Sequence, residues 1–181
     1  MRSIRQFADP QPQSPRYARG FTLIELMTVV VILAVFAGIA VPSFTRFINN
    51  NRTQSANDEL VALLNFTRAT AVAERGFIRA CQEDNGSWTV KTECSNDQPI
   101  RTFSPPPGIS IDASTQDLAF QYNGSASDKA SFYVCIDDDF ANGFTIDVKK
   151  SGGIRSYGRG KSGVNDSMTR CTQPPSEAGD E

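Results

Sequence analysis

Glu25 is an acidic residue inside an apolar run, and this placement suggests a chemical role. The run covers residues 21–41, and its other polar side chains are Thr22 and Thr28. A carboxylate at membrane depth is costly, and ionisable residues in such segments usually serve a function. An opposite charge close by would offset part of that cost. The question is therefore which cation Glu25 meets.

The tripeptide Arg19-Gly20-Phe21 offers such a cation. It lies just before the apolar run, whereas an ordinary secretory signal is cut after a shorter apolar core. A cut between Gly20 and Phe21 would remove a charged leader, residues 1–20, and keep the helix with a free amine at Phe21. Glu25 lies four residues after Phe21, which is one helical turn. The spacing thus predicts an amine and a carboxylate near the same helix tip.

Four cysteines could form two disulfide bonds. They are Cys81, Cys94, Cys135 and Cys171. Four cysteines allow three pairings, and the sequence alone does not exclude any of them. We predict that Cys81 pairs with Cys94, because this bond would join a strand to a nearby segment. Cys135 would then pair with Cys171 on a returning segment. The loop-entropy model gives about 3 kcal/mol for the shorter loop and about 4 kcal/mol for the longer one.

Residues 149–161 combine basic side chains, glycines and one Tyr. The candidate DNA-binding residues are Lys149, Lys150, Arg155, Tyr157, Arg159 and Lys161. Such a segment can follow a phosphate backbone, and Tyr157 could stack on a base. The favoured interpretation is a solvated hairpin or a contact with another subunit, whose exposed charges should contribute little to folding. The net charge of −2, more acidic once residues 1–20 are removed, also argues mildly against DNA as the main ligand.

The composition argues against an enzyme. The chain has no His, which is the commonest general base and the commonest metal ligand. No nucleophile–base pairing, phosphate-binding loop or CxxC zinc spacing is visible. The acidic run 137–139, followed by Asn142 and Gly143, superficially suggests Ca²⁺, but the alternation of an EF-hand loop and its terminal Glu are missing. We interpret the run as a solvated turn and predict no metal, no cofactor and no catalytic residue.

The apolar run must position the amine and the carboxylate. As a helix, residues 21–41 would reach roughly 32 Å, about the thickness of the hydrocarbon layer. Four Arg precede the run with one Asp opposing them, so the positive-inside rule keeps that end cytoplasmic. Residues after 42 would then lie in an oxidising compartment, which agrees with disulfide bonds. The prediction is one membrane pass, with lipid contact through residues 21–41.

The helix is predicted to continue to residue 75. Pro42 could bend it, and the weakly helix-forming run 47–55 is interpreted as a loose joint. Beyond that joint, a stripe of residues at helical spacing should pack on a sheet. The stripe comprises Ala56, Leu60, Leu63, Leu64, Thr67 and Ala71. Gly76 is expected to end the helix.

Short strands follow, separated by turns of Gly, Pro, Asn and Asp. They are predicted at 77–81, 87–91, 100–103, 109–111, 118–122, 131–136 and 143–149. A helix followed by such strands is an α+β order. We predict a long N-terminal membrane-spanning helix whose C-terminal half packs on an antiparallel β-sheet domain. The expected organisation is a leader at 1–20, an apolar helical half at 21–48, an α+β head at 49–171 and a disordered tail at 172–181.

The run RGFTLIELMTVVVILAVFAGIAVP, with the residues that follow it up to about 75, closely resembles the type IV pilin and type II secretion pseudopilin family. In that family an aspartyl prepilin peptidase cuts after the Gly and methylates the new N-terminal Phe, which correspond to Gly20 and Phe21. The family pairs the acid, here Glu25, with the N-terminal amine of a neighbouring subunit during assembly. The resemblance implies an inner-membrane protein with a periplasmic head, which enters a pilus or pseudopilus. The implied partners are other minor and major pilins, the peptidase and an inner-membrane assembly platform.

The helix-plus-strand order and the run LVALLNFTRATAVAER, residues 60–75, look most like the FimT/FimU and GspH group of this family. This resemblance implies a non-enzymatic minor pilin near the pilus tip, which supports pilus biogenesis, twitching motility or adhesion. A pseudopilin of type II secretion shares every N-terminal feature and is one alternative. DNA uptake is the other, because some FimT-type members bind DNA through a Gly-Arg-x-Arg motif. Here residues 158–161 are Gly-Arg-Gly-Lys, so Lys161 keeps the positive charge of the last Arg in the motif but lacks its planar guanidinium.

Overall fold

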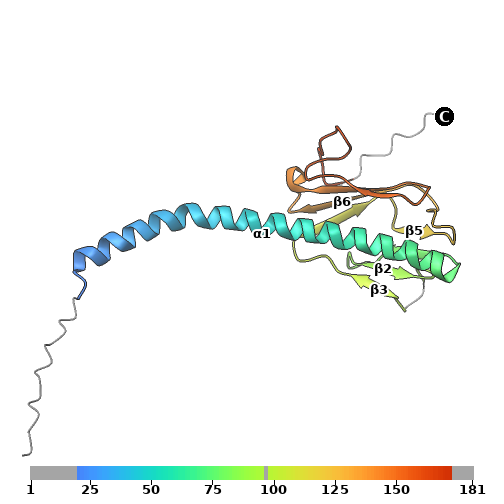
Figure 1. The fold of residues 1–181 in the computed structure, drawn as a ribbon, viewed down its shortest axis with the longest axis horizontal. Helices are drawn as coiled ribbons and strands as arrows, with labels where there is room; N and C mark the ends of the chain where they lie inside the picture. The colour runs from blue at the N-terminus through green and yellow to red at the C-terminus, as the bar shows by residue number, and fades with distance from the viewer. Residues whose placement is uncertain (1–19, 96–97, 173–181) are drawn as a thin grey trace, which may run out of the picture. The chain divides into compact units, whose positions relative to one another are not determined.

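The computed structural model describes residues 20–95 and 98–172 (Figure 1). The predicted leader, apart from Gly20, and the predicted tail, apart from Thr172, lie outside the described residues. The chain divides into two compact units, Met1–Pro42 and Ser43–Glu181. The first holds the apolar beginning of a helix, and the second holds the remainder of that helix together with all the strands.

The helix α1 covers Leu23–Glu74, which is 52 residues. It ends in a Schellman motif, in which the Gly76 N–H donates a hydrogen bond to the Ala71 carbonyl at 3.1 Å. Arg75, rather than a glycine, adopts the left-handed φ of 53° at this end. Gly76 therefore ends the helix as predicted, but it lies one position beyond the residue with positive φ.

The predicted loose joint at 47–55 is wrong, because α1 is unbroken through these residues. Thr53 is fully buried, and its hydroxyl donates a hydrogen bond to the Asn49 carbonyl at 2.9 Å. Tertiary packing of a helix face outweighs weak intrinsic propensity, which amounts to a few tenths of a kcal/mol per residue. The helix is also continuous at Pro42.

The strands form two antiparallel four-stranded sheets, with the orders β3-β2-β1-β5 and β4-β6-β7-β8. Their bounds are β1 Ile78–Gln82, β2 Trp88–Lys91, β3 Arg101–Phe103, β4 Ile109–Ala113, β5 Asp117–Phe120, β6 Ala130–Ile136, β7 Phe144–Val148 and β8 Ile154–Ser156, with a 3-10 turn η1 at Phe140–Asn142. Each predicted strand overlaps one of these. The additional strand β8 has three residues and lies inside the basic, Gly-rich segment.

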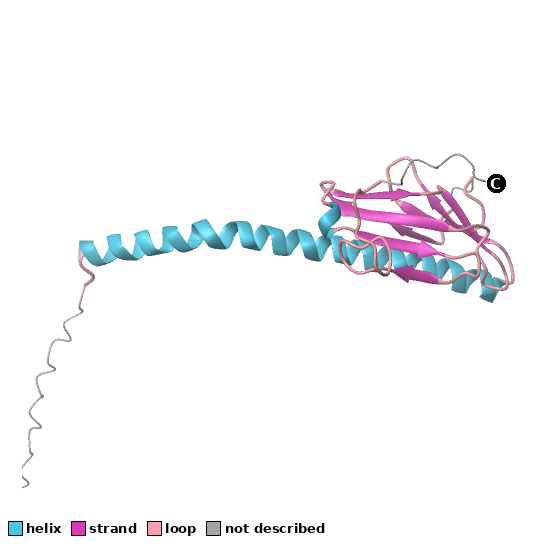
Figure 2. Ribbon diagram, turned by 90° about the horizontal axis from the view of Figure 1, so that it is seen from above, coloured by secondary structure: helices cyan, strands magenta, loops and turns pink. Residues whose placement is uncertain are grey.

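The C-terminal half of α1 packs against both sheets (Figure 1, Figure 2). The predicted stripe is confirmed, because each of its six members from Ala56 to Ala71 is at most 1% exposed. Full burial of a side chain such as Leu60 contributes about 1.5–3 kcal/mol. Trp88 on β2 and Phe132 on β6 meet edge-on in this core, with ring centroids 5.1 Å apart. One continuous core therefore joins the helix to both sheets.

Two disulfide bonds stabilise the head. Cys81 is bonded to Cys94 with an S–S distance of 2.00 Å, and Cys135 to Cys171 at 2.08 Å. This is the pairing expected from the sequence. The first bond crosses the end of the β1–β2 hairpin, and the second ties the segment after β8 back to β6.

Candidate functional site

The helix tip carries the three residues expected to act in processing and assembly. Gly20 and Phe21 are exposed and precede α1, and a side chain added at Gly20 would meet no described atom within 4 Å. Glu25 is exposed in the first helical turn. The bond between Gly20 and Phe21 is therefore accessible to an enzyme. In the uncut chain the nitrogen of Phe21 is a neutral peptide amide, so no charge at that atom faces Glu25.

Thr22 fixes the start of the helix, a role that sequence reasoning missed. Its Oγ1 accepts a hydrogen bond from the Glu25 N–H at 3.2 Å. The signal was present, because Thr followed three residues later by Glu is the pattern of a capping box. The Thr28 hydroxyl donates to the Glu25 carbonyl at 2.9 Å. The backbone around Glu25 is thus held from both sides, while its carboxylate has no partner among the described residues.

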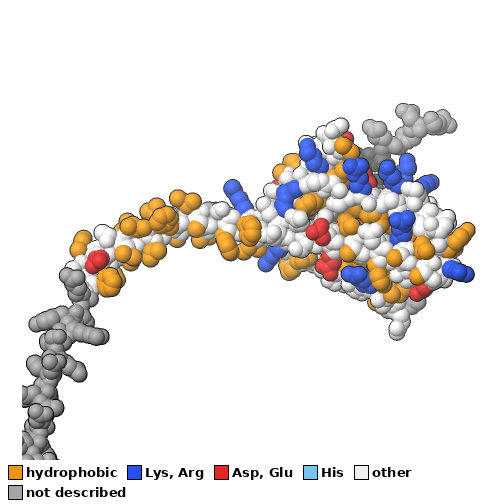
Figure 3. All heavy atoms as spheres, viewed as in Figure 1, with side chains coloured by type: hydrophobic (Ala, Val, Ile, Leu, Met, Phe, Trp, Pro, Cys, Tyr) orange, Lys and Arg blue, Asp and Glu red, His pale blue; other side chains and the backbone are white. Residues whose placement is uncertain are grey.

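The N-terminal part of α1 presents apolar side chains outward (Figure 3). Leu23, Ile32 and Ile39, for example, are each more than half exposed. In the described part of the chain, α1 is the one helix long and apolar enough to cross a membrane. Because exposure of such side chains to water is unfavourable, this surface requires lipid or other apolar helices around it.

The basic segment begins in the turn of the β7–β8 hairpin. The Gly152 N–H closes this turn by donating to the Lys149 carbonyl at 2.7 Å. Gly152 has a φ of 80°, and a Cβ there would collide with the Gly124 carbonyl, so the turn requires glycine at this point. The same Cβ would lie 3.0 Å from the Nε of Arg68 in α1, so the turn lies close to this side chain of the helix. Lys150 Nζ lies 3.4 Å from Asp128 Oδ1 in a well-exposed pair, which contributes little to stability.

Arg155 and Tyr157 pack on each other at β8 and just beyond it. The Arg155 guanidinium lies 5.2 Å from the centroid of the Tyr157 ring, a cation–π contact. Asp147 raises the pKa of Tyr157 above its ordinary value, mainly because its carboxylate accepts a hydrogen bond from the phenol. The ring is therefore already engaged within the chain, which leaves less of it for stacking on a base.

Arg159 differs most from the expectation of an exposed charge, because it is half-buried against α1. Its Nη2 donates to the Asn50 carbonyl at 3.1 Å and to Gln54 Oε1 at 3.3 Å. The guanidinium also lies over the Phe144 ring, 5.2 Å from the centroid. The expectation is wrong because the loop is held against the head, where the Gly160 N–H donates a hydrogen bond to the Gly143 carbonyl at 2.8 Å. Arg159 therefore bridges the C-terminal loop and the helix.

The candidate DNA contacts do not gather into one patch. The hairpin turn meets α1 at Arg68, whereas Arg159 meets it at Asn50. At the rise of an α-helix, these two positions are roughly 27 Å apart. Figure 3 accordingly shows Lys and Arg side chains scattered over the head among other side chains. The phosphates of a DNA strand would therefore meet these basic side chains singly along the hairpin and not as one continuous patch.

Replacing Arg159 should lower the stability of the head. Arg159→Gln removes the hydrogen bond to Asn50 and the contact with Phe144, and we expect the free energy of unfolding to fall by about 1–3 kcal/mol. Lys161→Gln is the matched control, because Lys161 is exposed and its loss should change that free energy by about 0.5 kcal/mol or less. Urea unfolding followed through Trp88, the one Trp and fully buried, measures both. Equal stability of the two variants would contradict the bridging role.

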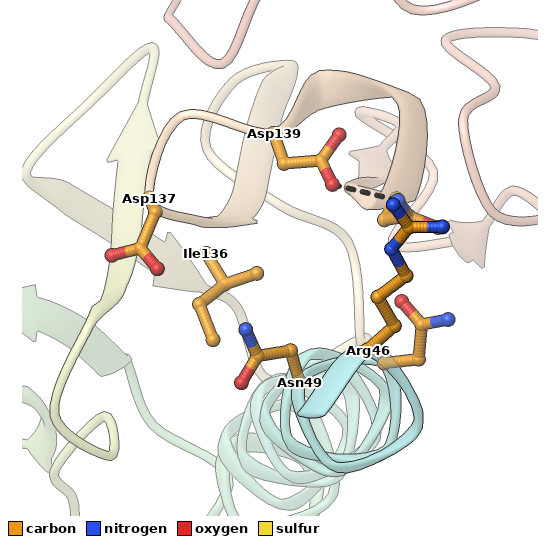
Figure 4. A pocket seen from close by; sticks show the side chains of 7 residues that line it. Arg46, Asn49, Ile136, Asp137 and Asp139 are labelled. Atoms are coloured by element: carbon orange, nitrogen blue, oxygen red, sulfur yellow. Dashed lines mark hydrogen bonds between the residues drawn. The ribbon is translucent and has the colours of Figure 1, made fainter. Parts of the chain in front are cut away.

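The acidic turn after β6 borders a pocket beside α1 (Figure 4). The turn is exposed, as expected for a solvated turn, and Asp137 and Asp138 adopt left-handed φ values of 49° and 58°. The pocket has a volume of about 490 Å³. Its polar lining comprises Arg46, Asn49 and Asn50 from α1, and Asp137, Asp139 and Asn142 from the turn and η1. A guanidinium in the wall is unfavourable for a cation such as Ca²⁺.

Two protein families match the chain. The family described as Type II transport protein GspH matches residues 56–152, which is more than half of the chain. The prokaryotic N-terminal methylation motif matches residues 15–41. The chain therefore belongs to the GspH family, within the type IV pilins and pseudopilins.

Curated relatives match over a short stretch. The chain is 49% identical over 45 residues to the Type IV major pilin protein PilA of Myxococcus xanthus (strain DK1622), which covers 25% of this chain and 20% of that protein. It is 43% identical over 44 residues to the Type IV major alpha-pilin of Moraxella bovis, covering 24% of this chain and 28% of that protein. The chain thus spans less than a third of the length of these relatives.

The head has a solved structural relative. The crystal structure of the type IV minor pilin FimU of Pseudomonas aeruginosa (strain PAO1) superposes with a TM-score of 0.55 at 22% identity, covering 62% of this chain and 92% of that one. At this identity the likeness concerns the fold. It is the pilin fold, a long apolar N-terminal helix packed on antiparallel sheets, and the predicted fold class is confirmed.

Proposed function

We propose that this protein is a minor type IV pilin, a structural subunit and not an enzyme, which assembles through its N-terminal helix near the pilus tip. The observation that supports this most is an exposed apolar helix whose capped tip presents Gly20-Phe21 and Glu25, continuous with a head that has the fold of FimU. In that position the subunit would support pilus biogenesis, twitching motility or adhesion.

The proposed route begins in the inner membrane, with the head in the periplasm. A prepilin peptidase cuts between Gly20 and Phe21 and methylates the new amine of Phe21. This amine then attracts Glu25 of a neighbouring subunit, where low dielectric strengthens the attraction although desolvation offsets much of the gain. Glu25 thereby sets the register between helices. The neighbours are other minor and major pilins, and an inner-membrane platform drives assembly.

A minor pseudopilin of type II secretion is the second candidate, and the family description favours it. DNA uptake stays a prediction from the sequence, because Lys150 and Arg159 already have partners within the chain. Salt-dependent DNA binding that disappears when Arg159 and Lys161 are both changed to Gln, in a variant whose Trp88 fluorescence shows an intact head, would favour DNA uptake over both structural roles.

The location of the mature chain tests the proposal. We expect mass spectrometry of filaments sheared from the cell surface to find the chain with N-methylated Phe21 as its first residue. A strain without the pilus assembly platform is the control, because it should keep the same mature chain in the membrane. Recovery exclusively with a type II secretion pseudopilus would assign the chain to secretion. A mature chain that starts at Met1, or after residue 41, would contradict a pilin altogether.

A further inference from the structure

The pocket beside the acidic turn is lined by side chains of both signs of charge (Figure 4). Arg46 extends from α1 towards the turn, and Asp137 and Asp139 belong to the turn itself. Its volume of about 490 Å³ falls within the range of about 300–1,000 Å³ that small-molecule sites occupy. The pocket is therefore large enough for a ligand that touches both walls.

These charges are not neutralised within the part of the chain that the structure describes. The Arg46 guanidinium and the Asp137 carboxylate make no ion pair or hydrogen bond with a described residue. Asp139 Oδ2 accepts a hydrogen bond from Asn142 Nδ2 at 2.6 Å, a bond to a neutral group. A matching ligand carries an anionic and a cationic group close together.

Arg46 follows the apolar run 21–41 by five residues of α1. Because α1 is unbroken here, Arg46 stands roughly 7.5 Å of helical rise beyond Val41. A bilayer extends beyond its hydrocarbon core by roughly 5–8 Å on each side. Two exposed rings lie close to the lining residues in the sequence, although neither lines the pocket: Phe47 follows Arg46 in α1 at 61% exposure, and Phe140 in η1 is 43% exposed. Exposed apolar rings among charged residues suit a boundary between lipid and water.

We propose that this pocket binds the headgroup of phosphatidylethanolamine while the chain stands in the membrane. The shared chemistry is a phosphate ester that bears a primary ammonium. Arg46 binds the phosphate through its planar guanidinium. The carboxylates of the turn attract the ammonium, Asp137 foremost, because Asp139 already accepts a hydrogen bond from Asn142. The proposal rests on the membrane anchoring within the proposed function and not on the pilus. A bound headgroup would hold the head at the membrane surface until the subunit leaves for a filament.

Other ligands leave the Arg46 guanidinium, or the carboxylates of Asp137 and Asp139, without an oppositely charged partner that can hydrogen-bond to them. A phosphatidylglycerol headgroup has no cation for the carboxylates, and the quaternary ammonium of phosphatidylcholine has no N–H to donate to them. Ca²⁺ would face the Arg46 guanidinium, and a simple anion would face Asp137 and Asp139. Phosphoethanolamine complements both walls at once.

Native mass spectrometry of the full-length protein tests the proposal. The chain is placed in nanodiscs with equal parts of phosphatidylethanolamine, phosphatidylcholine and phosphatidylglycerol, then released into detergent and weighed with its retained lipid. We expect one phosphatidylethanolamine to be retained at least about fivefold more often than either other lipid. Arg46→Gln, and Asp137→Asn combined with Asp139→Asn, should each lower that retention about tenfold, as the loss of a charge-assisted contact predicts.

Matched variants separate the pocket from general effects of charge. Arg52→Gln makes the same charge change at another exposed position of α1, and it should retain the lipid as the unaltered chain does. Arg46→Lys, which keeps the charge without the fork, should lose part of the retention. Trp88 fluorescence identical to that of the unaltered chain shows that each variant is folded. Equal retention of the three lipids, or full retention by Arg46→Gln, would overturn the proposal.

Soluble O-phosphoethanolamine distinguishes the lipid from a free ligand with the same chemistry. At about 1 mM, a concentration that would half-saturate a site with a Kd of about 1 mM, it should leave the bound lipid in place. Complete displacement would overturn the lipid assignment and give the pocket to a soluble ligand. Entry of the same variants into filaments is measured separately. A failure of lipid binding is therefore distinguishable from a failure of the pilin proposal.

Discussion

Glu25→Ala should remove the protein from filaments while leaving it processed and in the membrane. The substitution deletes the carboxylate at the capped helix tip, so the amine of a neighbouring Phe21 loses its partner. We expect the filament fraction to fall at least about tenfold relative to the membrane pool. Removing one partner of a buried charge pair leaves the other charge unpaired, which costs about 3–5 kcal/mol, and a loss of about 1.4 kcal/mol already changes an equilibrium tenfold. Immunoblots of sheared filaments and membranes measure the ratio.

Two further variants sharpen this test. Glu25→Asp keeps the charge but is shorter by one methylene, so its entry into filaments should be partly impaired. Glu59→Ala removes an exposed acid from the part of the same helix that lies in the head, and it should enter filaments normally. Normal entry of Glu25→Ala would rule out the role in register.

Gly20→Val should leave the leader attached. The peptidase must approach the backbone at Gly20, and a β-branched side chain there would displace the bond to be cut, which can lower a rate by about a hundredfold. The chain itself has room for the new side chain, because a Cβ at Gly20 would meet no described atom within 4 Å. N-terminal sequencing of the membrane-extracted protein should therefore find the uncut leader in place of N-methylated Phe21.

Gly38→Val is the matched control for processing. Gly38 lies in the apolar part of α1, and a Cβ there would also meet no described atom within 4 Å. This variant should be cut and methylated normally, since the change lies well beyond the cleavage bond. A Gly20→Val chain that still begins at Phe21 would show that the enzyme reads other residues than Gly20.

Local patterns in the sequence were sufficient to predict the elements of the fold. The stripe from Ala56 to Ala71 has helical spacing, and α1 buries all of it. The strands were visible as short apolar runs between turn residues, and each predicted run overlaps a strand. Cys81 lies in β1 and Cys94 in the segment just after β2, so the two cysteines are close in the sequence, and the chain after β2 brings Cys94 back to Cys81. These features depend on residues that are close in the sequence.

The features that were missed depend on contacts between distant segments. In the sequence, Arg159 is one of several basic residues in a Gly-rich run, and such residues are expected to be exposed. In the structure its guanidinium donates a hydrogen bond to the carbonyl of Asn50, 109 residues earlier. β8 is too short to be recognised without β7, which pairs with it. The supposed joint at 47–55 failed for the same reason, because the burial of Thr53 comes from tertiary packing rather than from local propensity.

The bridge from Arg159 to α1 also sets an order of events during folding. Arg159 and Asn50 are separated by 109 residues, and the Ser156 hydroxyl reaches Asn57 Oδ1 at 2.9 Å across 99 residues. Contacts over such separations form late, because the entropy of loop closure opposes them. The helix is made first, so its apolar stripe stays uncovered while the strands are still being synthesised. Until the last strand arrives, that stripe is the surface through which the nascent chain would aggregate.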